Sequence, residues 1–254
     1  MVLAIDIGNT NIVIGIFEND AFSFKERIST DTSKTDLEYV VEFQALLNLY
    51  DIDKKKIDGA VISSVVPPLN NVINSVVYKV FGVKALMVGP GIKTGLNLAV
   101  DNPASVGADL IVDSVAGLKD YGAPLILIDM GTATTVTVVD KYGSFIGGMI
   151  LPGARVSLDS LVNRTSQLPT ISIEPSKNVV GKNTVDCMKS GIVNGQAAML
   201  DGLIDKINTE LGYSCKVVAA GGLVSCIVPH CSHEIIIDDE LTLRGLKYIY
   251  EKNK

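Results

Sequence analysis

The chain has 254 residues, of which 47% are hydrophobic, and a formal net charge of −6 from 22 basic and 28 acidic residues. This length suits one large domain or two of ordinary size, and a chain this acidic is a poor binder of nucleic acids and of membrane surfaces. No run of 18 apolar residues occurs, and Asp6 interrupts the first apolar segment. We therefore expect neither a membrane span nor a signal peptide.

The first half of the chain alternates strand and helix signals. Apolar, β-favouring runs predict strands over residues 2–7, 12–17 and 22–28, and near-helical spacing predicts a helix over residues 35–50 with Thr35 as its N-cap. The remaining elements expected there are a strand over 59–65 ended by Pro67-Pro68, a helix over 69–81, a strand over 85–88, a loop over 90–103 and a helix over 105–118.

The second half repeats this order. The expected elements are strands over 125–129, 136–139 and 144–150, helices over 156–162 and 184–211, strands over 217–220 and 235–237, and a closing helix over 241–250. Each half therefore follows a β-β-β-α-β-α pattern, which indicates an α/β protein with an internal duplication. We expect two domains, 1–120 and 121–254, each with a mixed sheet flanked by helices.

The two halves share one short motif. Asp6-Ile7-Gly8-Asn9-Thr10-Asn11 and Asp129-Met130-Gly131-Thr132 each follow a strand and precede another strand. Backbone N–H groups of glycine turns can approach phosphate oxygens, and a carboxylate at a strand end can reach Mg²⁺ or another cation. One copy alone is equally compatible with an ordinary hairpin turn. Two copies at matching positions predict a clamp for the phosphates of a nucleotide.

Other nucleotide signatures are weaker. The strand at 217–220 ends in Gly221-Gly222, which can place an adenosine against backbone, although such turns are also common in packing. Gly91-Ile92-Lys93 and Gly181-Lys182-Asn183 each depart from the P-loop pattern. The nucleotide site is therefore expected at the paired aspartate turns.

The cysteines and histidines do not indicate a disulfide framework or a metal site. The chain has four cysteines, Cys187, Cys215, Cys226 and Cys231, with no CxxC pair. This pattern is typical of a reducing cytoplasm. His230 and His233 lie close to the last two cysteines, but four potential ligands in one short segment do not match the two separated ligand pairs of usual zinc sites.

Paired Asp-x-Gly turns with a late Gly-Gly resemble the phosphate and adenosine elements of the actin/Hsp70/sugar-kinase superfamily, whose domains are duplicated and ribonuclease H-like. More closely, the chain resembles the type III pantothenate kinases, nearly from end to end and with the motifs in the expected order. The motifs that carry this resemblance are residues 6–11, Ser63-Ser64-Val65-Val66-Pro67-Pro68, residues 89–96, Asn102-Pro103, Val106-Gly107-Ala108-Asp109, residues 129–135, Leu168-Pro169 and Val180-Gly181-Lys182-Asn183-Thr184.

The resemblance implies transfer of the γ-phosphate of ATP to pantothenate, the first step of coenzyme A biosynthesis. It also implies a homodimer, Mg²⁺ and a monovalent cation, K⁺ or NH₄⁺. The implied ATP contacts are Asp6, Ile7, Gly8, Asn9, Thr10, Asn11, Ile12, Val13 and Thr132. The implied substrate contacts are Val100, Gly107, Ala108, Asp109, Leu110 and Thr184, with Asp109 as the catalytic base. Asp129 is the implied ligand of the monovalent cation, and Asp6 the implied ligand of Mg²⁺ through water.

Several of these residues also have purely structural interpretations. Asp109 could favour a helix N-terminus, Thr184 could be an N-cap, and Arg155 could be an exposed surface residue. The chain also departs from the family. Leu110 stands where the family usually has arginine, Val100 where many relatives have an aromatic residue, and Asp113 where asparagine is common. A kinase of another small hydroxyl substrate and a non-catalytic nucleotide-binding or regulatory homologue are therefore the alternative functions.

Overall fold

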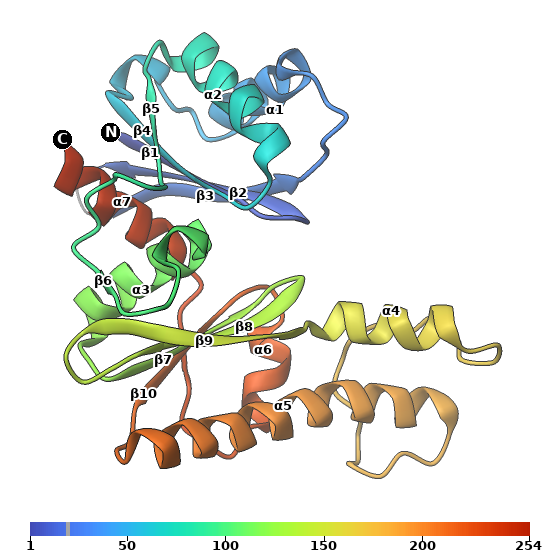
Figure 1. The fold of residues 1–254 in the computed structure, drawn as a ribbon. Helices are drawn as coiled ribbons and strands as arrows, with labels where there is room; N and C mark the ends of the chain where they lie inside the picture. Colours follow the sequence, from blue (N-terminus) through green and yellow to red (C-terminus); the bar gives the residue numbers. More distant parts are fainter. Residues whose placement is uncertain (19–20) are drawn as a thin grey trace. The chain divides into compact units, whose positions relative to one another are not determined.

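The computed structural model describes residues 1–18 and 21–254 and divides the chain into two compact units (Figure 1). Unit 1 comprises Met1–Gly95, Asn102–Ala116 and Leu241–Lys254, and unit 2 comprises Leu96–Asp101 and Gly117–Glu240. The units are not contiguous in sequence, unlike the expected halves 1–120 and 121–254. Residues 241–254 fall in unit 1 because their helix packs its apolar face on the N-terminal sheet.

The sheet of unit 1 has the strand order β3-β2-β1-β4-β5. Its strands are β1 (Val2–Ile7), β2 (Asn11–Glu18), β3 (Ala21–Ser29), β4 (Gly59–Ser64) and β5 (Ala85–Met87). The central strand β1 pairs antiparallel with β2 and parallel with β4. Because β1 and β4 are buried on both faces, they read as nearly continuous apolar runs until their carboxyl ends, where Asp6 and Ser63 lie.

Helices cover both faces of this sheet. On one face, α1 (Asp36–Leu49) and α2 (Pro67–Phe81) pack against Leu3, Ile5 and Ile7. On the other face, α3 (Ala108–Tyr121) and α7 (Leu241–Asn253) pack against Ala4 and Val61. Helix α1 begins with a capping box at Thr35, as expected, whereas the two prolines form the first turn of α2. Proline is well tolerated there because the first helical N–H groups have no intrahelical partner.

The sheet of unit 2 has the order β11-β10-β7-β8-β9-β6. Its strands are β6 (Asn97–Leu98), β7 (Leu125–Met130), β8 (Ala133–Val139), β9 (Ser144–Pro152), β10 (Lys216–Ala220) and β11 (Ile236–Ile237). Its helices are α4 (Ala154–Arg164), α5 (Thr184–Leu211) and α6 (Val224–Ile227), and short 3₁₀ turns occur at Lys54–Lys56, Pro103–Ser105 and Val228–His230.

The predicted duplication is confirmed by the pairing pattern. In unit 1, β1 and β2 form an antiparallel hairpin, β3 pairs antiparallel with β2, and β4 and then β5 continue the sheet in parallel on the other side of β1. In unit 2, β7, β8, β9, β10 and β11 follow the same pattern in the same order. The extra strand β6 lies within the expected loop 90–103, so that part of the prediction was wrong. Asn97 and Leu98 are extended because they pair with Ser144 and Phe145, a partner that local sequence does not reveal.

No helix among residues 1–18 and 21–254 is long and apolar enough to cross a membrane.

Candidate active site

The first aspartate turn connects β1 to β2 in unit 1. The Gly8 N–H donates to the Asn11 carbonyl at 3.0 Å, and a Cβ at Gly8 would lie only 3.1 Å from that oxygen. Glycine is favoured here by the tight closure of the turn. Asn9 and Thr10 are exposed at its tip.

The turn is fastened from the end of the neighbouring strand β3. The Thr30 hydroxyl donates to the Gly8 carbonyl at 2.6 Å, and the Thr30 N–H donates to the Thr10 carbonyl at 3.0 Å. These bonds fix two carbonyl groups of the turn and hold it against the end of β3. Sequence reasoning missed Thr30, whose only signal is a polar residue directly after a strand.

Asp6 lies at the carboxyl end of β1 and is half-buried. Side chains alternate along a strand, so Asp6 shares a face with Ala4, and both belong to the face covered by α3 and α7. Asp6 pairs in register with Val13 on β2 and with Ser63 on β4. The carboxylate is therefore at the carboxyl end of the two central strands.

Asp109 is in the first turn of α3, over the same face of the unit 1 sheet. The side chain is partly buried, and the Leu110 N–H donates to its Oδ1 at 2.9 Å. Burial raises the pKa of Asp109 above that of an exposed aspartate, although the hydrogen bonds from Leu110 and from its own backbone act in the opposite direction. A raised pKa makes a carboxylate a better proton acceptor. Unit 1 thus brings Asp6 and Asp109 to one face of one sheet.

Gly107 provides space for the Asp109 carboxylate. A Cβ at Gly107 would lie 2.4 Å from Asp109 Oδ1, far inside ordinary contact. The backbone of Gly107 does not require positive φ, so the missing side chain matters here for space alone. The Gly-Ala-Asp segment therefore holds the carboxylate folded back over the start of its own helix.

The second aspartate turn connects β7 to β8 in unit 2. Asp129 is half-buried, and its carboxylate oxygens lie 3.5 Å and 3.9 Å from the Cβ position of Gly131. Gly131 and Thr132 are exposed at the tip of the turn. This is an arrangement of carboxylate, glycine N–H and hydroxyl similar to that of unit 1.

Two glycines bring other backbone segments against this second turn. A Cβ at Gly153, the N-cap of α4, would lie 2.3 Å from the Thr132 carbonyl oxygen. A Cβ at Gly221 would lie 2.7 Å from the backbone of Met130, and the φ of Gly221 is +109°. The end of β10 and the start of α4 can therefore approach the turn this closely only because residues 221 and 153 are glycine.

The other expected substrate contacts lie in unit 2. Val100 follows β6 and is half-buried, and Thr184 is exposed as the first residue of α5. The proposed capping role of Thr184 was wrong, because the Asn183 side chain is the N-cap and accepts from the Asp186 N–H at 2.9 Å. Arg155 is exposed on α4, as its structural interpretation predicted.

The two P-loop-like segments have packing roles. The Asn253 side chain of α7 forms hydrogen bonds with the N–H and carbonyl of Lys93, at 3.0 Å and 2.8 Å. A Cβ at Gly181 would lie 2.4 Å from the Cys187 nitrogen, so this glycine allows the loop to pack on α5. Both observations agree with the rejection of these segments as P-loops.

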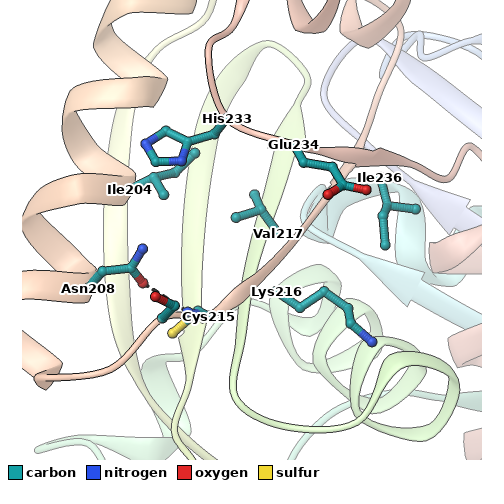
Figure 2. Close-up of a pocket in the computed structure, with 9 residues that line it drawn as sticks. Ile204, Asn208, Cys215, Lys216, Val217, His233, Glu234 and Ile236 are labelled. Atoms are coloured by element: carbon teal, nitrogen blue, oxygen red, sulfur yellow. Dashed lines mark hydrogen bonds between the residues drawn. The ribbon is translucent and has the colours of Figure 1, made fainter.

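A surface cavity of about 350 Å³ lies at the amino ends of β10 and β11 in unit 2, the ends opposite to Gly221 (Figure 2). Its lining residues are Ile204, Asn208, Ser214, Cys215, Lys216, Val217, His233, Glu234 and Ile236, none of which is a predicted site residue. His233 pairs with Asp205 at 2.9 Å, and all four cysteines are free thiols. Among the described residues, no group of three or more histidine, cysteine or acidic side chains is arranged to hold a metal ion.

Comparison with known sequences identifies one family. A sequence model of the family described as type III pantothenate kinase matches residues 2–206. The chain is 43% identical over 253 residues to a type III pantothenate kinase of Geobacillus sp. (strain WCH70), covering 100% of this chain and 98% of the relative. It is 44% identical over 254 residues to a type III pantothenate kinase of Brevibacillus brevis, covering 100% of both.

Solved structures share the fold at low sequence identity. One is a conserved putative Baf family transcriptional activator from Campylobacter jejuni, with a TM-score of 0.63, 18% identity and coverage of 99% of this chain and 98% of that chain. Another is component A of (R)-2-hydroxyglutaryl-CoA dehydratase from Acidaminococcus fermentans, with a TM-score of 0.58, 12% identity and coverage of 100% and 99%. These similarities bear on the fold alone, and they confirm the predicted duplicated, actin-like architecture.

Proposed function

This chain belongs to the type III pantothenate kinase family and phosphorylates pantothenate at the expense of ATP, and we propose that Asp109 is the base of this reaction. The observation that supports this role is the position of Asp109, partly buried at the start of α3 on the sheet face that also carries Asp6. The hydroxyl of pantothenate has a pKa far above 7, so the proton leaves only as the new O–P bond forms. Asp109 accepts it at that moment.

The aspartate turns bind the nucleotide in this proposal. The exposed tip residues Asn9, Thr10 and Thr132 would donate to phosphate oxygens, together with backbone N–H groups of the two turns. Most of the rate enhancement then comes from positioning and from neutralising charge, as in other phosphoryl transfers.

The residues present fit the two expected cations. Mg²⁺ favours oxygen ligands and usually keeps several waters, so one half-buried carboxylate beside a phosphate-binding turn is suitable, and Asp6 would hold it through water. The Asp129 carboxylate beside Gly131 offers oxygen ligands to K⁺ or NH₄⁺. When bound, these cations would supply positive charge near the phosphates, a role that a lysine fills in P-loop proteins and for which this sequence has no P-loop.

We also propose a homodimer that forms through an apolar surface of unit 2. The exposed side chains of this surface are Ile150, Val156, Leu161, Val179, Val180 and Val185, and Ile150 and Val180 are 77% and 76% exposed. They lie on β9, on α4, on the segment that leads into α5 and, for Val185, in the first turn of α5, and α4 packs on α5 (Figure 1). Large exposed apolar patches mark protein–protein interfaces, and this placement of the dimer assumes that these residues form one. Sedimentation of Leu161→Glu should show a monomer where the parent protein is a dimer, and an unchanged dimer would contradict this placement.

We also propose a cytoplasmic location, because the cysteine pattern is typical of a reducing compartment.

A direct assay tests the proposed base. The purified protein is given ATP, Mg²⁺, K⁺ and pantothenate, and phosphopantothenate is measured. Asp109→Asn should lower kcat by about 10²- to 10⁴-fold while the far-ultraviolet circular dichroism is unchanged. Asp159→Asn, an exposed acid on α4, is the matched control and should keep normal activity. A near-normal rate for Asp109→Asn would exclude Asp109 as the base.

Leu110 bears on substrate affinity. It is half-buried in the first turn of α3, next to the base, and it contributes no charge where the family usually has arginine. Arginine there would provide a charge-assisted bond to the pantothenate carboxylate, so Leu110→Arg should lower the pantothenate KM by about tenfold. An unchanged KM would show that this position does not contact the carboxylate.

A further inference from the structure

Ser63 is the polar residue at the carboxyl end of the otherwise apolar part of β4. Its side chain is completely buried, and among the described residues its Oγ has no hydrogen-bond partner. A buried hydroxyl without a partner destabilises a fold, because it loses its bonds to water and gains none in return. Such a group in a native protein calls for an explanation.

The position of Ser63 supplies one. Ser63 pairs in parallel register with Asp6, and both residues belong to the sheet face that α3 and α7 cover. Their side chains therefore leave adjacent strands on the same side of the sheet. A serine hydroxyl can donate one hydrogen bond, and a carboxylate is the strongest acceptor among side chains.

The duplicated unit 2 provides an internal comparison. There the equivalent strands are β7 and β10, and the residue in register with Asp129 is Ala220. Ala220 is also buried. The same fold thus tolerates a methyl group at this place, and the hydroxyl of Ser63 is not a requirement of the strand pairing. In unit 1 the hydroxyl lies next to Asp6, the aspartate proposed to hold Mg²⁺.

We propose that Ser63 is a positioning residue for Asp6. When Mg²⁺–ATP is bound, the Ser63 hydroxyl donates to a carboxylate oxygen of Asp6 and fixes the orientation of the carboxylate toward the metal-bound water. This inference rests on the proposed role of Asp6. Asp6 would contact the metal through water, so Ser63 orients an outer-shell partner of the metal, and loss of outer-shell interactions typically weakens metal binding about 10- to 100-fold.

The test measures metal binding apart from catalysis. Mn²⁺, a paramagnetic substitute for Mg²⁺, is titrated into the protein with a non-hydrolysable ATP analogue and followed by electron paramagnetic resonance. Ser63→Ala should raise the Mn²⁺ dissociation constant about 10- to 100-fold and leave the pantothenate KM unchanged. The urea midpoint of the metal-free variant should stay the same or rise, because the variant loses an unpartnered hydroxyl.

Two further variants complete the experiment. Ser75→Ala removes a serine hydroxyl that donates to Asp36 at 2.7 Å on the other face of the same unit, so it should lower the urea midpoint without changing Mn²⁺ binding. In an Asp6→Asn background, Ser63→Ala should have no additional effect on Mn²⁺ binding. If Asp6→Asn weakens Mn²⁺ binding and Ser63→Ala does not, the inference about Ser63 is overturned and the role of Asp6 stands. If Asp6→Asn itself leaves Mn²⁺ binding unchanged, the proposed role of Asp6 fails first.

Discussion

Gly107→Ala is expected to impair catalysis without disturbing the fold. The new Cβ would lie 2.4 Å from Asp109 Oδ1, whereas an ordinary contact begins at 3.4 Å, so the oxygen must move by about 1 Å. The atom in the way is the far end of a side chain, and the φ of Gly107 is not positive. The carboxylate therefore swings aside while the backbone stays in place. The swing also disturbs the 2.9 Å bond from the Leu110 N–H.

A displacement of about 1 Å in a catalytic group can lower the rate by roughly 10²-fold. We therefore expect kcat of Gly107→Ala to fall by about that factor in the phosphopantothenate assay, with an unchanged ATP KM and an unchanged urea midpoint. The control is Gly202→Ala, because Gly202 lies within α5 with nothing near its Cβ position, and this variant should be active and about 1 kcal/mol more stable. A Gly107→Ala enzyme that retains at least a third of the normal kcat would refute the reasoning, since Asp109 would then not need its observed position.

Further predictions concern the pH dependence of stability and the second turn. Burial raises the pKa of Asp109 in the folded protein, so the folded state loses stability as pH rises from the unfolded pKa of about 4 through the folded value. Asp109→Asn cannot ionise at this position and lacks this loss. The urea midpoint of the variant minus that of the parent should therefore be larger at pH 7 than at pH 4. The same difference at both pH values would contradict the raised pKa. Gly221→Ala should destabilise by clearly more than the roughly 1–2 kcal/mol that positive φ alone costs, because its Cβ also meets the Met130 backbone at 2.7 Å. Gly212→Ala, with a φ of +73° and open space, measures the cost of a left-handed φ without a close approach, and an equal or smaller loss for Gly221→Ala would show that the close approach is unimportant.

Much of the fold follows from local sequence signals. The apolar run at the start of the chain forms β1, the Thr35 capping box begins α1, and the periodic segment from Thr184 to Leu211 forms α5 with the predicted bounds. These signals are local because hydrogen bonding and side-chain periodicity within a strand or helix depend on neighbours in sequence. Element ends were less predictable: Ser105 lies outside α3, which starts at Ala108.

The two aspartate turns could also be predicted from the sequence, since each joins two strong strand signals through a short polar loop. The residues that contact these turns from other elements could not be predicted. Thr30, Gly153 and Gly221 fasten or approach the turns from other elements, and nothing in the neighbouring residues distinguishes them from an ordinary strand end, helix start or packing turn. The two-residue strand β6 was missed for the same reason, because it is a strand only through its pairing with β9, which is distant in sequence.

The sequence by itself therefore determined the duplicated α/β class, the two turns with Asp6 and Asp129, and, through the family motifs, the chemistry expected of Asp109. Only the tertiary structure decided that α7 completes unit 1, that Gly107 leaves room for a partly buried Asp109, and that the hydroxyl of Ser63 lies unpartnered beside Asp6. The physical reason is that pKa shifts, close backbone approaches and unsatisfied polar groups depend on what surrounds a residue in space. Those neighbours come from strands and helices that are distant in the chain.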